Sequence, residues 1–400
     1  MGQEEQNNIR IVKYMKILFA LTYYRPHMSG LTIYAERLAK ALIKEGHYVT
    51  IMTSQYDSQF PIEEVIDGVR VVRVPVWMRI SKGVVMPAFG HIAGKLLREH
   101  DVVHLHLPQF DSARVVLRGW LQKKPIVITY HCDLKLPRTI FNWFANQSVL
   151  IMNNIAAVFT DRIVTYTRDY AEHSRFIMRF KKKLSVINPP VQLPNVTQEQ
   201  IKEFGKTQNP NNAYPIIGMA ARFASEKGVE VLLNSLDYIT KKYPNAQVWF
   251  AGPYENIMGE QQYYDRLKPL IDRYISKGNW KFLGLLSPTQ MALFYPNIDI
   301  LTIPSLNSTE AFGLIQIEAM MNGVPSIASN LPGVRQPVLR HQMGEIIPIG
   351  DSKMLAEAVD KIMGNYASYS DHYQGIAEQY APKKTAEAYA ILYGELLGRS

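Results

Sequence analysis

The sequence predicts an α/β protein made of two consecutive domains, each built on a doubly wound parallel sheet. Short apolar segments alternate with amphipathic segments of helical periodicity through both halves of the 400-residue chain. A stretch rich in proline and asparagine, INPPVQLPNV (187–196), interrupts this alternation near the middle of the chain. The length allows two ordinary hydrophobic cores, and 47% hydrophobic with 20% charged residues is typical of globular proteins.

The first half contains the expected strands of one sheet, with helical segments between them. The clearest helix covers 32–47, where apolar residues recur every three or four positions and Gly46 is placed to end it. This is the βαβ pattern of a parallel sheet. The expected strands are 16–21 (KILFAL), 48–54 (YVTIMTS), 69–76 (VRVVRVPV), 102–107 (VVHLHL), 126–131 (IVITYH) and 162–167 (RIVTYT).

A second series of strands follows the interruption, so we expect two Rossmann-like domains with a cleft between the carboxyl ends of their strands. The strands expected in this half are 214–221 (YPIIGMAA), 246–252 (AQVWFAG), 280–284 (WKFLG), 298–305 (IDILTIPS), 324–329 (VPSIAS) and 344–349 (GEIIPI). The predicted organisation is a loosely ordered extension (1–14), an N-terminal domain (15–190), a C-terminal domain (191–382) and a C-terminal helix (383–400) that can pack back on the N-terminal domain.

Positive charge is concentrated in the first half of the chain. Residues 1–190 hold 26 Lys and Arg against 15 Asp and Glu, whereas residues 191–400 hold 18 against 20. An ordinary solvated surface accounts for this pattern, and so does contact with an anionic partner such as a membrane surface or a phosphorylated acceptor. Aromatic residues beside cations in 137–157 and 175–183 favour peripheral contact with anionic lipid, whereas a core helix beside a basic surface is the alternative.

The cysteine content and hydropathy favour a cytoplasmic protein, with the inner face of the membrane as the place of any peripheral contact. Cys132 is the single cysteine, so no disulfide can form within the chain, which suits a reducing compartment. No run of 18 apolar residues suggests a spanning helix. The apolar segment 17–24 is too short for a signal peptide core and fits a buried first strand better.

The loop AARFASEKG (220–228) places two cations after an expected strand and before a helix. Arg222 can grip a diphosphate through its planar fork, and Lys227 can do so as a point charge. Taken alone, the loop is equally an exposed turn with two cations.

The segment EAFGLIQIE (310–318) places an acid at each end of an apolar run. It lies between an expected strand and a helix that Gly323 is placed to end. Glu310 lies before this helix and Glu318 about one turn inside it, so both can reach one pocket, where a carboxylate can accept hydrogen bonds from the vicinal hydroxyls of a sugar. Backbone N–H groups at the start of the helix, at Phe312, Gly313 and Leu314, favour an anion. A capping acid and an exposed helix acid remain the alternative.

Other motifs carry less information. In YYRPHMSGLTIYAERLAKAL, Gly30 lets the chain approach a bound group, but the dinucleotide fingerprint G-x-G-x-x-G is absent, which disfavours a nicotinamide dehydrogenase. We interpret His104 and His106 as structural or substrate-positioning residues, and His131 as a candidate for a cleft. No zinc pattern and no D-x-D occur, so no metal site is expected, and nothing suggests a nucleic-acid partner.

With these motifs assembled, the chain resembles the retaining GT-B glycosyltransferases of family 4, over nearly its whole length. The last motif matches the E-x7-E pattern of that family, and the Arg…Lys-Gly loop lies at the proper distance upstream. The resemblance implies a GT-B fold, a nucleotide-diphosphate sugar as donor, and a glycan or lipid-linked hydroxyl as acceptor in cell-surface polysaccharide or glycolipid synthesis. It also implies retention of anomeric configuration, with no cofactor and no metal.

Carried over by position, the resemblance assigns a role to each candidate residue. Arg222 and Lys227 would hold the diphosphate, Glu318 the ribose and Glu310 the transferred sugar. The turn Phe312, Gly313, Leu314 and Ile315 would contact the donor, Leu286 would lie by the base, Gly30 would belong to a loop closing over the phosphates, and His131 would line the reaction centre. The stretch after FLG, LLSPTQ, has no acid to read guanine, which favours a UDP-sugar over GDP-mannose. A nucleotide-sugar epimerase and a non-catalytic nucleotide-sugar-binding protein are the alternative functions.

Overall fold

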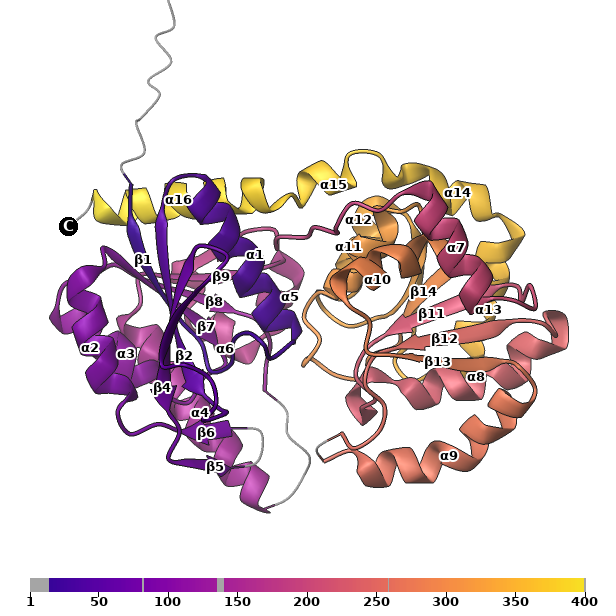
Figure 1. Ribbon diagram of the computed structural model, residues 1–400, viewed down its shortest axis with the longest axis horizontal. Helices are drawn as coiled ribbons and strands as arrows, with labels where there is room; N and C mark the ends of the chain where they lie inside the picture. Colours follow the sequence, from indigo (N-terminus) through magenta and orange to yellow (C-terminus); the bar gives the residue numbers. More distant parts are fainter. Residues whose placement is uncertain (1–13, 81–82, 135–139, 258, 399–400) are drawn as a thin grey trace, which may run out of the picture. The chain divides into compact units, whose positions relative to one another are not determined.

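The computed structural model describes residues 14–80, 83–134, 140–257 and 259–398. These residues form two compact units (Figure 1). Unit 1 comprises Met1–Tyr130, Ser148–Val164 and Lys383–Ser400, and unit 2 comprises His131–Gln147 and Thr165–Pro382. Apart from Tyr14, the predicted N-terminal extension lies outside the described residues.

Unit 1 is built on a sheet whose strands run in the order β9-β8-β7-β1-β2-β4-β3. Neighbouring strands are parallel except β3, which is antiparallel to β4. The six strands predicted for this half are confirmed; β3, the hairpin β5–β6 and the short strand β10 (Leu184–Val186) were not predicted, because their sequences are short and lack a buried apolar run. The bounds are β1 Lys16–Ala20, β2 Tyr48–Gln55, β3 Glu63–Ile66, β4 Val69–Pro75, β5 Met78–Ile80, β6 Gly83–Val85, β7 Val102–Leu107, β8 Ile126–Tyr130 and β9 Arg162–Thr165.

The helices of unit 1 cover this sheet through apolar faces. Helix α1 begins two residues before the predicted start, because the Ser29 side chain accepts a hydrogen bond from the Thr32 backbone and so caps the helix. It buries Tyr34, Leu38 and Leu42 completely. The helices are α1 Gly30–Lys44, α2 Phe89–Glu99, α3 Ser112–Leu121 and α16 Pro382–Leu397, and α4 Ile140–Phe159 contributes its second half.

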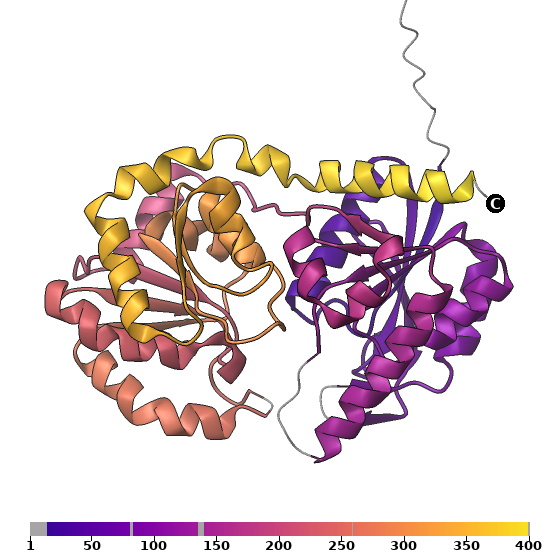
Figure 2. The same ribbon diagram turned by 180° about the vertical axis from the view of Figure 1, so that it is seen from behind.

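The C-terminal helix α16 belongs to unit 1 and lies beside its strands (Figures 1 and 2). The Tyr389 hydroxyl lies 2.8 Å from the Tyr34 hydroxyl of α1 and 2.6 Å from the Thr129 hydroxyl of β8. The Tyr393 hydroxyl lies 2.7 Å from Nδ1 of His104. Buried tyrosines thus attach the end of the chain to the first core through satisfied hydrogen bonds.

Unit 2 is built on a fully parallel sheet in the order β13-β12-β11-β14-β15-β16. All six strands predicted for the second half are present. Their bounds are β11 Ile216–Ala220, β12 Gln247–Ala251, β13 Trp280–Gly284, β14 Ile300–Ile303, β15 Ser326–Ser329 and β16 Gly344–Ile347. The two parallel-strand sheets confirm the predicted α/β class of two Rossmann-like domains.

Helices pack against both faces of the second sheet, and α8 lies against α13. The stretch 187–196 forms neither helix nor strand, as its prolines predict. The helices of unit 2 are α5 Arg168–His173, α6 Arg175–Arg179, α7 Gln198–Gln208, α8 Val229–Lys242, α9 Gln261–Ser276, α10 Pro288–Phe294, α11 Leu314–Met320, α12 Gln336–His341, α13 Ser352–Gly364, α14 Tyr366–Ser370 and α15 Ile376–Gln379, with strand β10 at Leu184–Val186.

The order of strands in unit 2 decides which loops meet. Strand β11 lies between β12 and β14. From β11 the chain continues to β12 and β13 on one side, and it then returns to β14 on the other side. All strands are parallel, so the loops that follow β11 and β14 emerge at the same edge of the sheet. The close approach is visible in the backbone: the Leu306 amide donates to the Glu226 carbonyl at 2.9 Å, and a Cβ on Gly228 would lie 1.9 Å from the Pro304 carbonyl oxygen.

Candidate functional site

Lys227 and Glu310 form an ion pair at this edge of the second sheet. Lys227 ends a short 3-10 turn, Ser225–Lys227, after β11, and Glu310 precedes α11. The Lys227 Nζ lies 2.7 Å from Glu310 Oε2, and each side chain is 22% exposed. Burial alone lowers the pKa of the Lys227 ammonium, but the Glu310 carboxylate more than offsets this, so the pKa lies above its usual value. Lys227 is therefore a fixed cation at neutral pH.

Arg222 is held by two acids of the same unit. Its guanidinium contacts the Glu226 carboxylate and lies 3.9 Å from Oε1 of Glu260. Glu260 is buried and accepts a hydrogen bond from the Ser225 amide at 3.1 Å, which fixes the loop between β11 and α8. Two cations, Arg222 and Lys227, thus face three carboxylates.

Glu318 lies in the second turn of α11 and is buried, with 7% of its surface exposed. Its Oε2 accepts a hydrogen bond from the Tyr295 hydroxyl at 2.7 Å, and Tyr295 is itself fully buried. This contact orients one face of the carboxylate. The interpretation of Glu318 as an exposed helix acid is excluded by its burial.

The turn before α11 depends on glycine and on a buried amide. Gly313 adopts φ +77° and ψ 72°, a left-handed conformation that favours glycine. The buried Gln316 side chain donates to the Phe312 carbonyl at 3.0 Å and to the Val334 carbonyl at 2.9 Å. These bonds hold the backbone of Phe312 and Gly313, while Leu314 and Ile315 form the partly exposed start of the helix.

His131 directly follows β8 and is placed in unit 2 with the turn described above. Its Nδ1 contacts the Tyr166 hydroxyl, and the Tyr166 ring packs edge-on against Phe312 with centroids 5.9 Å apart. The neighbouring thiol of Cys132 has a pKa raised to about 12, by burial first and then by the Glu310 carboxylate. Cys132 is therefore a neutral thiol rather than a nucleophile.

Two further predicted residues lie on other elements, one in each unit. Gly30 is the first residue of α1 in unit 1, and a Cβ built on it would meet no atom within 4 Å. Leu286 lies between β13 and α10 in unit 2 and is buried. The core residues His104 and His106 are fully buried and stack with ring centroids 4.4 Å apart, and burial lowers the pKa of His106 to about 3.

Sequence reasoning missed the partners of the site residues. Glu226 lies inside the quoted loop, so its contact with Arg222 was within reach of a local argument. Glu260, Tyr295, Gln316 and Tyr166 carry no local signal, because the tertiary structure brings them to the site.

Metal-ligand clusters, membrane-spanning helices and a separate cavity complete the description of the described residues. Over the described ranges, no group of three or more His, Cys, Asp or Glu side chains is placed to hold a metal ion. No described helix is long and apolar enough to cross a membrane. A cavity of about 650 Å³ in unit 2 includes none of the predicted site residues; it is lined by Asn234, Asp237, Tyr238, Pro348, Ile349, Gly350, Asp351, Ser352 and Lys353.

Comparison with known proteins gives two family matches, one in each half of the chain. The family model described as Glycosyltransferase Family 4 matches residues 28–193. The family model described as Glycosyl transferases group 1 matches residues 200–379. The chain is a glycosyltransferase. The Lys227–Glu310 pair and Glu318 fall within the second match, and Gly30 and His131 fall within the first.

Curated relatives of this glycosyltransferase agree with the family. An uncharacterised glycosyltransferase of Methanocaldococcus jannaschii is 24% identical over 412 residues, which cover 96% of this chain and 100% of the relative. The phosphatidyl-myo-inositol mannosyltransferase of Mycobacterium leprae is 22% identical over 347 residues, or 84% of each chain.

Among solved structures, Anabaena HepE in complex with UDP-glucose superposes on this glycosyltransferase with a TM-score of 0.77 at 16% identity. The match covers 95% of this chain and 100% of HepE. At this identity the likeness shows the fold, which is GT-B, as predicted.

Proposed function

We propose that this glycosyltransferase moves a hexose from a nucleotide-diphosphate sugar to a hydroxyl of a glycan or lipid-linked acceptor, with retention of anomeric configuration. The observation that carries the proposal is the Lys227–Glu310 pair, which joins the loops after β11 and β14 at 2.7 Å, with Glu318 buried eight residues further along. A cation beside two carboxylates matches the chemistry of a sugar attached to a diphosphate.

In this proposal the bound donor takes over part of the ion pairing that Arg222 and Lys227 otherwise make with neighbouring carboxylates. The diphosphate would take Arg222 and Lys227 as partners, in place of part of their contacts with Glu226 and Glu310. The Glu310 carboxylate would then accept hydrogen bonds from hydroxyls of the transferred sugar. Glu318, which accepts a hydrogen bond from Tyr295, would accept hydrogen bonds from the ribose hydroxyls.

The leaving diphosphate gains negative charge as the glycosidic bond breaks. Lys227 and Arg222 would stabilise that charge without a metal ion. The acceptor hydroxyl would attack on the face that the diphosphate leaves, and its proton would pass to the leaving phosphate oxygen. In this scheme Glu310 positions the sugar and is no nucleophile. His131, held by Tyr166, would contribute from the acceptor side, and Gly30 would let the chain approach the phosphates.

The proposed donor is a UDP-sugar rather than GDP-mannose. The segment after β13 carries no acid that would pair with the N–H groups of guanine, and the buried Leu286 lies there. HepE, which shares the fold, is described in complex with UDP-glucose. The Mycobacterium leprae relative is named a mannosyltransferase. GDP-mannose is therefore the donor with which a UDP-sugar should be compared.

A thermal-shift panel of UDP, GDP and ADP sugars tests the donor, because a ligand that binds the folded state raises its stability. The preferred donor is then incubated with candidate acceptors, and the product is examined by NMR for its anomeric configuration. Transfer with inversion contradicts the retaining mechanism. An epimerised nucleotide sugar formed without an acceptor would replace the proposal with the epimerase alternative, and binding without any turnover would favour the non-catalytic one.

The proposed acceptor is lipid-linked or a surface polysaccharide, reached at the inner face of an anionic membrane. Helix α4 supports this because its 20 residues include no charged side chain. It nevertheless exposes Trp143 (56%), Phe144 (61%) and Ile151 (54%). Exposed aromatic and aliphatic residues in a strongly basic half of a chain are features of interfacial binding. The Mycobacterium leprae relative is named for a phosphatidylinositol acceptor.

Sedimentation with vesicles tests this part of the proposal. Binding to anionic vesicles but not to neutral ones is expected, and a Trp143→Ser, Phe144→Ser double variant should lose most of it. The matched control is Tyr238→Ser, an exposed aromatic of unit 2 outside the basic half. Equal binding to both vesicle types, or to neither, contradicts a membrane-bound acceptor.

A further inference from the structure

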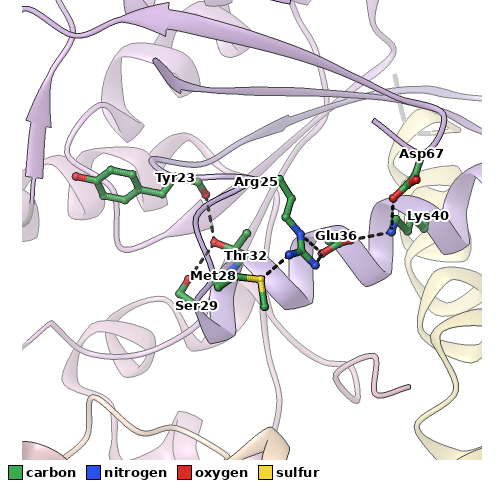
Figure 3. Close-up of polar contacts among 8 residues, drawn as sticks. All are labelled: Tyr23, Arg25, Met28, Ser29, Thr32, Glu36, Lys40 and Asp67. Carbon is green, nitrogen blue, oxygen red and sulfur yellow. Dashed lines mark hydrogen bonds and ion pairs between the residues drawn. The ribbon is translucent and has the colours of Figure 1, made fainter. Parts of the chain in front are cut away.

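An ion-pair network in unit 1 lies between the loop that follows β1 and helix α1. Figure 3 shows its members, which include Arg25 of the loop, Glu36 and Lys40 of the helix, and Asp67 of the turn between β3 and β4. Gly30, the residue expected at the donor phosphates, is where this loop enters the helix. The network therefore bears on the placement of Gly30.

Arg25 ties the loop to the helix that the loop leads into. Its Nε donates to Glu36 Oε2 at 2.6 Å, and its Nη2 lies 2.5 Å from the same oxygen. Glu36 is an acid among the buried residues of α1, and only 8% of its surface is exposed. A carboxylate at such a position needs a partner, and ion pairs of this kind fix geometry more than they add stability.

The same loop residue is also held from the sheet. The Arg25 carbonyl accepts a hydrogen bond from Nη2 of Arg73 at 3.1 Å. Arg73 lies on β4, and its side chain is 1% exposed. Arg25 thus has its side chain fixed by α1 and its backbone fixed by β4.

The two ends of the loop are closed by local hydrogen bonds. The Thr32 hydroxyl donates to the Tyr23 carbonyl at 3.4 Å, and the Ser29 hydroxyl lies 3.0 Å from the Thr32 hydroxyl. Between them Arg25 Nη1 contacts the Met28 sulfur. These contacts involve residues on either side of Gly30 in the sequence, and Gly30 itself is exposed.

The outer part of the network does not touch the loop. Lys40 Nζ lies 2.7 Å from Glu36 Oε1 and 2.6 Å from Asp67 Oδ2. It joins the helix to a turn on the far side of Glu36 from Arg25 (Figure 3). The Glu36 carboxylate therefore has two cationic partners, Arg25 and Lys40, and of these two only Arg25 belongs to the loop.

We propose that Arg25 is a positioning residue for sugar transfer: by pairing with Glu36 it holds the loop Tyr23–Ser29 so that Gly30 meets the donor phosphates in a single geometry. This inference rests on the proposed function. Misplacing a group by about 1 Å costs on the order of 100-fold in rate. The effect falls on turnover more than on nucleotide affinity, because the other proposed nucleotide contacts, those of Arg222, Lys227 and Glu318, lie in unit 2.

The kinetic test compares Arg25→Gln with Lys40→Met. Arg25→Gln should lower kcat by about 10-fold to 100-fold while the dissociation constant for the free nucleotide changes by less than about twofold, and Arg25→Lys should recover part of the loss. Lys40→Met should leave kcat within about twofold of the parent. Adding Arg25→Gln to Glu36→Gln should cost nothing further, because both remove the same contact. Equal losses from Arg25→Gln and Lys40→Met, or additive losses in the double variant, overturn the inference.

A second measurement needs no activity. Hydrogen exchange of the loop, including the His27 amide that donates to the Tyr24 carbonyl at 3.1 Å, should be about tenfold faster in Arg25→Gln and unchanged in Lys40→Met. Unchanged exchange in Arg25→Gln overturns the inference. If the parent enzyme transfers sugar from no donor, the proposed function fails instead, and the exchange result still decides whether Arg25 orders the loop.

Discussion

Replacing Lys227 with alanine removes a cation that, in the proposed mechanism, binds the donor diphosphate and stabilises the charge that develops on it as it leaves. The Lys227 side chain is 22% exposed, so an effective dielectric constant of about 20 suits its surroundings. At that value two unit charges about 4 Å apart interact by about 4 kcal/mol. Because kcat/KM compares the transition state with free enzyme and substrate, about 3 to 4 kcal/mol of this interaction should be lost, which is a factor of about 10² to 10³ in kcat/KM.

The same substitution should leave the fold nearly intact. The pair that Lys227 forms with Glu310 is partly exposed, and such a pair contributes about 1 kcal/mol to the free energy of unfolding. The melting temperature should therefore fall by only about 2 to 4 °C. The loss of activity and the loss of stability are thus separable in one protein sample.

The assay is steady-state transfer with the donor chosen by thermal shift, with the melting temperature measured on the same preparation. Lys268→Ala is the matched control, because Lys268 also pairs with an acid of unit 2, Asp272, but at an exposed site on α9. It should change neither kcat/KM nor the fold. A correctly folded Lys227→Ala variant with turnover near that of the parent would refute the assignment of Lys227 to the diphosphate.

Four further predictions concern α11, the turn before it and the start of α3. Glu318→Gln should weaken binding of the free nucleotide by about tenfold whatever sugar the donor carries, since one charge-assisted bond to the ribose is lost; Glu310→Gln should instead alter discrimination between sugars. Gly313→Ala should cost about 1 to 3 kcal/mol of stability, because alanine is strained at φ +77° and its Cβ would lie 2.8 Å from the Gln316 amide nitrogen. Burial raises the pKa of the Asp111 carboxyl from 3.8 to about 6, although Arg114 lies 3.1 Å away. The folded state therefore holds this proton more tightly than the unfolded state, and the free energy of unfolding should fall by roughly 3 kcal/mol as pH rises through that window.

Each of these has a direct measurement. The ratio of kcat/KM values for two sugars carried by the same nucleotide follows Glu310→Gln, and an unchanged ratio contradicts the sugar assignment. Isothermal titration with UDP and GDP follows the effect of Glu318→Gln, and an unchanged dissociation constant for both contradicts the ribose assignment. Thermal melting follows Gly313→Ala against Gly364→Ala, whose Cβ meets no atom within 4 Å and which should melt like the parent. Melting of Asp111→Asn between pH 4 and pH 7 should show a shallower pH dependence than the parent; parallel curves would show that this carboxyl does not titrate as described.

Local sequence determined the secondary structure because hydrophobic periodicity is a local property. All twelve strands predicted for the two sheets form within one or two residues of either end, and the break at 187–196 contains no helix or strand. The start of α11 could also be predicted from the sequence, since a glycine at the strand-to-helix turn permits the left-handed backbone that Gly313 adopts. The short edge strand β3 was missed, because its sequence EEVI gives no buried face to recognise.

Pairing between side chains was decided by the tertiary structure. Lys227 and Glu310 are 83 residues apart and meet because β11 and β14 are neighbours in a parallel sheet, a fact that no local pattern encodes. For Glu318 the sequence left both a pocket residue and an exposed helix acid open, and the structure decides between them by burying it with the Tyr295 hydroxyl 2.7 Å away. Glu260 could not be predicted from the sequence as a site residue, although it lies near Arg222 and accepts a hydrogen bond from the Ser225 amide.

The sequence by itself therefore determined the class of fold, the order of its strands along the chain, and the residue types at the end of each strand. Only the tertiary structure decided which of those residues face one another, how far each charge is withdrawn from water, and that the last helix closes the first core through Tyr389 and Tyr393. The physical reason is that periodicity depends on neighbours within a few residues, whereas an ion pair depends on the order in which strands assemble into a sheet.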